Sequence, residues 1–175
     1  LPLVTFMLLS PPVRAQIRYT DIEPDTLIAD TNDIPGQYKL DLDGDGRSDY
    51  FVMHFYYPIP VYVLSIDTEY NTAHEVLLDG ENSVPALAAG ESIDDTRMNW
   101  HCSASGSHSD GMSFEASWFG SGDHYIGLRV RAGEVWHYGW LRAEVAADQS
   151  SILLKDFAVH TQADTPIKAG ETGMV

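Results

Sequence analysis

Short runs that alternate apolar and polar residues recur along the chain from Gln16 onward, separated by clusters of Gly, Pro, Asn and Asp. An alternation with a period of two is typical of strands that bury one face, and no sustained helical period interrupts it. We therefore expect an all-β fold, a two-sheet antiparallel β-sandwich of the jelly-roll kind, because no helix-length amphipathic segment separates the runs. The expected strands cover residues 17–22, 26–29, 37–42, 50–57, 61–66, 73–78, 97–102, 112–119, 124–131, 135–146 and 152–160.

The clearest predicted pair joins residues 124–131 to residues 135–146 through Ala132-Gly133-Glu134. Gly133 can adopt the positive φ that a tight hairpin requires. The first strand alternates strictly, so one of its faces should lie in the core and the other in water. The apolar residues of the core face are Ile126, Leu128 and Val130.

The first nine residues are almost wholly apolar, and Ser10-Pro11-Pro12 and Val13-Arg14-Ala15 follow them. This order is typical of a secretory signal peptide, which we expect over residues 1–15, cut before Gln16. The segment lacks an initiator Met and a basic start, so we expect the sequence to begin inside that peptide. A membrane-spanning helix needs about 20 apolar residues, which this run does not supply. We expect a secreted or cell-surface protein, with the periplasm as an alternative compartment.

The length of 175 residues and the hydrophobic content of 44% suit one domain with a sizeable core. We assign residues 16–161 to the sandwich and residues 162–175, which are polar and rich in small residues, to a C-terminal tail. A single cysteine, Cys102, excludes an internal disulfide.

The formal net charge of the chain is −16 at pH 7. This charge repels nucleic acids and anionic membrane surfaces and attracts cations. We therefore exclude nucleic acid as a partner and expect no membrane insertion of the mature chain.

The strongest chemical signal is the run Asp41-Leu42-Asp43-Gly44-Asp45-Gly46-Arg47-Ser48-Asp49, a D-x-D-x-D-G-x-x-D loop. Alternate carboxylates can converge on one hard cation, and Gly46 permits the sharp turn that folds them inward. We predict a calcium site with side-chain ligands from Asp41, Asp43 and Asp45, the backbone carbonyl of Arg47, and Asp49 directly or through water. The alternative is an ordinary Asp-Gly turn held by side-chain-to-backbone hydrogen bonds.

An EF-hand does not fit this loop, because its twelfth position is Val52 and a β-rich run follows. The loop resembles the strand-loop-strand calcium sites of FG-GAP-type and thrombospondin-type repeats. We expect a structural staple with an extracellular calcium affinity of about 10⁻⁴ to 10⁻³ M.

Short motifs along the chain carry a wider resemblance: YTDI at 19–22, LDLDGDG at 40–46, YIGLR at 125–129, HYGWLR at 137–142, KDFA at 155–158 and AGE at 169–171. With them the chain resembles uncharacterised secreted proteins of environmental bacteria. The resemblance implies an exported β-sandwich and supplies no reaction.

Trp136, Tyr138 and Trp140 alternate along one expected strand, so their side chains share a face at a spacing of about 7 Å. A row of rings at this spacing suits stacking against a sugar chain, and an extracellular glycan is therefore a possible ligand. The alternative is that the row packs beneath a loop or the second sheet.

Catalytic motifs are weak. His101, His108, Asp110 and His124 could form a metal or acid-base site if residues 103–111 fold over the sheet. No G-x-S-x-G elbow or H-E-x-x-H motif is present. We expect no enzyme. The first hypothesis is a calcium-binding structural module, or a surface interaction module that binds a surface protein or matrix. The second hypothesis is a carbohydrate-binding module, and the third is a hydrolase.

Overall fold

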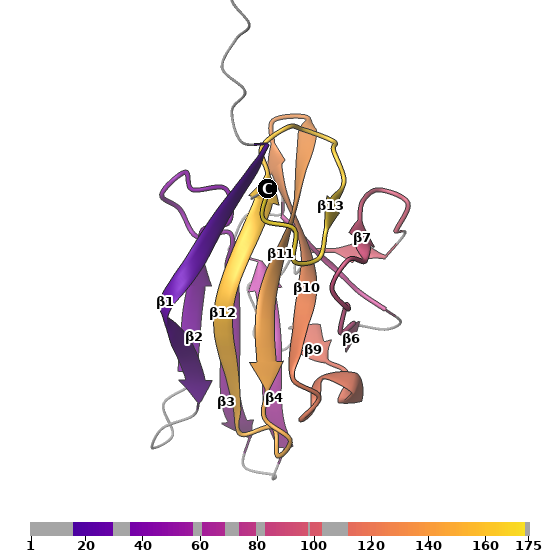
Figure 1. Ribbon diagram of the computed structural model, residues 1–175. Helices are drawn as coiled ribbons and strands as arrows, with labels where there is room; N and C mark the ends of the chain where they lie inside the picture. The colour runs from indigo at the N-terminus through magenta and orange to yellow at the C-terminus, as the bar shows by residue number, and fades with distance from the viewer. Residues whose placement is uncertain are drawn as a thin grey trace, which may run out of the picture.

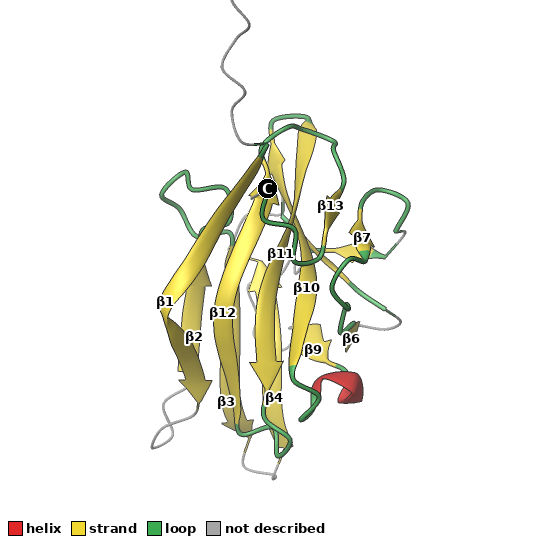
Figure 2. Cartoon of the chain, in the orientation of Figure 1, coloured by secondary structure: helices red, strands yellow, loops and turns green. Residues whose placement is uncertain are grey.

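The computed structural model describes residues 16–29, 36–57, 61–68, 74–79, 83–97, 99–102 and 112–173, and these residues are mostly strands (Figure 2). The all-β prediction is confirmed. The strands are β1 (Ile17–Ala29), β2 (Gly36–Leu40), β3 (Tyr50–Tyr57), β4 (Val61–Thr68), β5 (Glu75–Leu77), β6 (Ser83–Val84), β7 (Ser92–Ile93), β8 (Trp100–His101), β9 (Met112–Phe114), β10 (Asp123–Ala132), β11 (Val135–Val145), β12 (Ser151–His160) and β13 (Ile167–Lys168), and the 3₁₀ helix η2 covers Ala116–Trp118.

The strands form two stacked sheets and a small pair. The larger sheet has the order β1-β12-β11-β10-β5-β8, the smaller one the order β2-β3-β4-β9-β6, and β13 pairs with β7. All pairs are antiparallel except β6 with β9. Figure 1 shows the larger sheet in front with β2, β3 and β4 behind it, which is the predicted sandwich.

The main core lies between the two sheets and consists of aliphatic and aromatic side chains from both. Both sheets present alternate residues to it, as a half-buried strand pattern requires. Fully buried members include Leu40, Leu42, Tyr50, Val52, Val76, Trp118, Ile126, Leu128, Val130, Leu141 and Ile152. The side chains predicted for the core face of β10 are therefore confirmed.

The hairpin of β10 and β11 is also confirmed. Its register pairs Ala132 with Val135, and Gly133 in the turn has a φ of 66°. That positive φ is accessible to glycine without the steric cost that a side chain would bring.

Strand β12 contains a bulge opposite the step from Arg142 to Ala143 of β11. Arg142 pairs with Asp156 and Ala143 with Leu154, so Lys155 has no partner residue on β11. Lys155 and Asp156 therefore both lie between two core residues, Leu154 and Phe157. On the side away from the core, the Arg142 guanidinium donates two hydrogen bonds to Asp156, at 2.8 and 2.7 Å.

Several expected strand boundaries differ from the structure, and two of these differences have a local cause. Residues 17–22 and 26–29 belong to one strand, β1, whose pairing with β12 shifts register between Asp21 and Thr26. Pro24 lies in that interval and lacks an N–H for the ladder, which explains the gap in the strand pattern. The expected strand 112–119 ends at Phe114, and the chain continues as η2, in which Trp118 is the buried residue.

The C-terminal segment is part of the fold and not a tail outside it. Residues 161–173 run over the outer face of the larger sheet, where β13 pairs with β7 and Ile167 is fully buried. The indole Nε1 of Trp140 donates to the Glu171 carbonyl at 3.1 Å. The small and polar composition of this segment suggested a tail, but its few apolar residues close a second core against Trp140 and Tyr138.

Replacing Ile167 by Ala should destabilise the protein by about 2–5 kcal/mol, because the change leaves a cavity in the second core. Leu27, which is 63% exposed, is the matched control, and Leu27→Ala should change stability by no more than about 0.5 kcal/mol. Urea unfolding followed by tryptophan fluorescence measures both. Equal, small effects would show that the C-terminal segment adds nothing to stability.

Candidate metal site in the loop between β2 and β3

The acidic loop connects β2 to β3 and is closed at its base by a hydrogen bond from the Asp49 amide to the Leu40 carbonyl, at 2.7 Å. Gly44 and Gly46 have φ values of 66° and 90°. Left-handed backbone at two positions lets the chain turn within a few residues, and glycine adopts it without strain. The loop geometry therefore follows from the two glycines that separate its carboxylates.

Backbone amides of the loop donate to its carboxylates. Asp41 accepts from Gly44, Asp45 and Gly46, at 2.6, 3.2 and 2.9 Å. Asp43 accepts from Asp45 at 3.1 Å, and Asp45 accepts from Arg47 at 2.8 Å. These are the side-chain-to-backbone bonds of an Asp-Gly turn, and they fix the orientations of the carboxylates from within the loop.

Asp49 is the buried member of the loop, with 3% of its surface exposed. Its Oδ2 accepts from the amides of Leu42, at 2.7 Å, and Asp43, at 3.4 Å. Burial raises the pKa of Asp49 to about 7, and the Asp43 and Asp41 carboxylates act in the same direction. The ionised form of this carboxyl group therefore lacks a counter-charge within the loop.

Three of the predicted ligands converge. One carboxylate oxygen each from Asp41, Asp43 and Asp49 lies within 4.8 Å of the other two, which is close enough to hold one metal ion; we call these residues the acidic trio. Asp45 is not part of the acidic trio, and its carboxylate is exposed and bonded to the Arg47 amide. Arg47 is exposed as well. The site thus has an exposed entrance and a buried floor at Asp49.

Arg18 of β1 lies against the loop from outside. Its Nη2 donates to the Leu42 carbonyl at 2.9 Å, and a Cβ on Gly44 would lie 2.6 Å from its Nη1. Gly44 is therefore required for its positive φ, and its missing side chain also leaves room for the guanidinium. Arg18 supplies a positive charge beside the acidic trio that the loop sequence alone does not reveal.

Tyr50, the residue after Asp49, anchors the loop to the larger sheet. It is fully buried, and its hydroxyl lies 2.8 Å from the Arg129 carbonyl and 3.2 Å from the Glu75 carbonyl. His74 lies beside it, with its Nε2 3.3 Å from Oδ1 of Asp49. Neither His74 nor Tyr50 could be predicted as a site residue, because their contacts join segments that are distant along the chain.

The aromatic row occupies one face of β11, as predicted, but that face is covered. Tyr138 and Trp140 are 3% and 1% exposed and belong to the second core. Only Trp136 is half-buried. Two of the three rings are therefore not available to stack on a sugar. The structure agrees with the alternative prediction, in which the row packs beneath a loop.

Trp136 stacks on arginine instead. The guanidinium carbon of Arg129 lies 4.2 Å from the centre of the Trp136 ring and 4.5 Å from that of Trp100. Arg129 also donates from Nε to Glu75 at 2.7 Å. We call these four residues the arginine clamp; it joins β5, β8, β10 and β11 through one desolvated cation.

The histidines of the hydrolase hypothesis are only partly within the described residues. His108 and Asp110 lie outside them. His101 is exposed on β8, whereas both ring nitrogens of His124 are buried and its ring packs edge-on against Trp118 at 5.6 Å. The two described histidines thus face different surroundings, and they do not build a common site.

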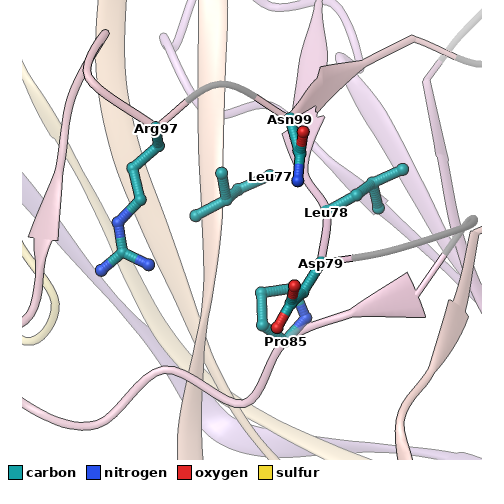
Figure 3. Close-up of a pocket in the computed structure, with 6 residues that line it drawn as sticks. All are labelled: Leu77, Leu78, Asp79, Pro85, Arg97 and Asn99. Atoms are coloured by element: carbon teal, nitrogen blue, oxygen red, sulfur yellow. The ribbon is translucent and has the colours of Figure 1, made fainter.

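A recess of about 200 Å³ lies beside the end of β5 (Figure 3). Leu77, Leu78 and Pro85 line its apolar part, and Asp79, Arg97 and Asn99 its polar part. Arg97 is bonded to the Glu91 carboxylate at 2.9 Å. Among the described lining residues Asp79 is the only carboxylate, so they do not form an acid-base pair.

No known family model, curated protein or solved structure matches the chain. Within the described residues no helix is long and apolar enough to span a membrane. Among the described residues, the acidic trio is therefore the strongest indication of function.

Replacing Arg129 by Lys should cost about 1–2 kcal/mol of stability, because Lys cannot keep both the planar stacking and the forked contact with Glu75. Arg131, whose side chain is 40% exposed and lies farther from the Trp136 ring, at 5.7 Å, is the control, and Arg131→Lys should cost less than about 0.5 kcal/mol. Urea unfolding tests both variants. A loss at Arg129 no larger than at Arg131 would contradict the clamp.

Proposed function

We propose that the protein is an exported β-sandwich that binds one calcium ion in the β2–β3 loop and acts as a surface or matrix interaction module. The observation that carries the proposal is the convergence of the acidic trio, whose oxygens lie within 4.8 Å of one another. Three carboxylates at this separation repel one another, and a divalent cation would remove that repulsion.

The donor set favours calcium over a transition metal. The acidic trio offers carboxylate oxygens only, and hard oxygen ligands suit calcium or magnesium. Calcium tolerates irregular geometry and a larger number of ligands, whereas magnesium demands a near-ideal octahedron. The exposed entrance leaves room for water to complete the coordination. We expect the affinity to lie in the extracellular range, about 10⁻⁴ to 10⁻³ M.

The proposed role of the ion is to staple the sandwich. The loop joins β2 to β3, and Tyr50 extends from it to the larger sheet. An ion bound to both the exposed part of the loop and the buried Asp49 would stiffen this connection. The export of the protein is proposed from the apolar run at residues 1–9, and the charge of −16 suits a soluble extracellular domain that carries a cation.

Calcium at 10 mM should raise the melting temperature relative to a chelator. At the expected affinity this concentration is about 10 to 100 times Kd, which stabilises by about 1.4–2.7 kcal/mol. The corresponding shift is about 3–10 °C for a protein of this size. Magnesium at the same concentration should give a smaller shift. Differential scanning calorimetry in calcium, magnesium and EDTA measures it, and identical melting in all three would refute the staple.

The variant Asp43→Asn should lose most of the calcium shift, because it removes one charged ligand. Asp95→Asn is the matched control, since Asp95 is an exposed carboxylate in a turn away from the loop. The control should keep the full shift. Equal shifts in both variants would place calcium binding elsewhere in the protein.

A further inference from the structure

We propose that His74 is a positioning residue of the calcium site, which holds the Asp49 carboxylate ready for the ion by donating a hydrogen bond from Nε2 to Oδ1. This inference rests on the proposed function. The supporting observation is the contact between His74, the residue just before β5, and Asp49 at the buried end of the loop. The spacing of the acidic residues in the sequence does not predict this contact.

The contact between His74 and Asp49 is enclosed. Nε2 of His74 lies 3.3 Å from Oδ1 of Asp49, and the two side chains are 13% and 4% exposed. The ring of Tyr50 packs beside that of His74, with the ring centres 6.1 Å apart. A polar contact shielded in this way competes little with water and can hold a side chain in one orientation.

The hydrogen-bond pattern around His74 selects its tautomer. The backbone amide of Arg131 points at Nδ1 from 3.4 Å, and an amide N–H can only donate. Nδ1 must then be the unprotonated nitrogen of a neutral imidazole, so Nε2 carries the proton and faces Asp49.

The bond from His74 complements the bonds on the other oxygen of Asp49. Oδ2 accepts from the Leu42 and Asp43 amides, so with the proposed bond from Nε2 to Oδ1 donors would hold the carboxylate at both oxygens. Each carboxylate oxygen has more than one lone pair, which leaves capacity for an ion. These donors would orient the carboxylate before an ion arrives, with one of its oxygens within 4.8 Å of an oxygen each from Asp41 and Asp43. Partners of this kind typically change metal affinity by about 10- to 100-fold when removed.

Two amide substitutions test the role of the Nε2 donor. Gln places its amide nitrogen near the position of Nε2, whereas the shorter Asn places it near Nδ1 and does not reach Asp49. In the full chain, titrated with calcium chloride by calorimetry, His74→Asn should raise Kd by about 10-fold or more. His74→Gln should stay within about 3-fold of wild type, as partial rescue of the same contact. His101→Asn and His101→Gln, at an exposed histidine on β8, are the matched controls and should not change Kd.

Wild-type affinity in His74→Asn would overturn the inference, and so would equal weakening by Asn and Gln, since loss of ring packing would then explain both. If either variant fails to fold, ¹⁵N NMR of the wild-type imidazole decides: a proton on Nδ1 overturns the inference, and a proton on Nε2 supports it. Absence of any calcium binding by the wild type would overturn the proposed function together with this inference. Calcium binding that His74→Asn leaves unchanged would overturn the inference alone.

Discussion

The architecture depends on one constraint: the larger sheet is apolar on the face toward the smaller sheet and on part of its opposite face. On β11, Leu141 faces the smaller sheet and its neighbour Trp140 faces the opposite way, and both are almost fully buried. A strand with this pattern needs a cover on each side, since the burial of apolar surface is the main force for folding. The smaller sheet covers one face and the C-terminal segment the other. The position of the smaller sheet in turn determines where the loop after β2 lies.

The packing of Tyr50 links that constraint to the candidate site. Its ring is buried between the sheets and its hydroxyl lies at the Arg129 carbonyl, so the start of β3 has little freedom. Asp49 precedes it directly and is thereby held against His74. Apolar packing thus places a carboxylate where burial alone would disfavour its charge, and the cation proposed for the loop would compensate that cost.

Local patterns in the sequence were sufficient to predict strands, turns and the faces that residues share along one strand. Period-two alternation identified β10 and β11 and the common face of the aromatic row, and the glycines marked the turns of the acidic loop. The same alternation cannot say whether a face is covered, and Trp140 is covered because Ile167 folds back over it from a segment that is mostly polar. The partnership of Asp49 with His74 was likewise beyond prediction, because it exists only once two sheets have met.

The bulge in β12 divides one strand into two patterns of opposite phase. Before it, even-numbered residues such as Ile152 and Leu154 face the main core; after it, the odd-numbered Phe157 and Val159 do so. Lys155 is the extra residue of the bulge, and it shifts the alternation by one position between the two halves. In a regular strand of the same sequence, without the bulge, the apolar residues of one half would point away from the core, so the bulge is what lets both halves of the strand face it.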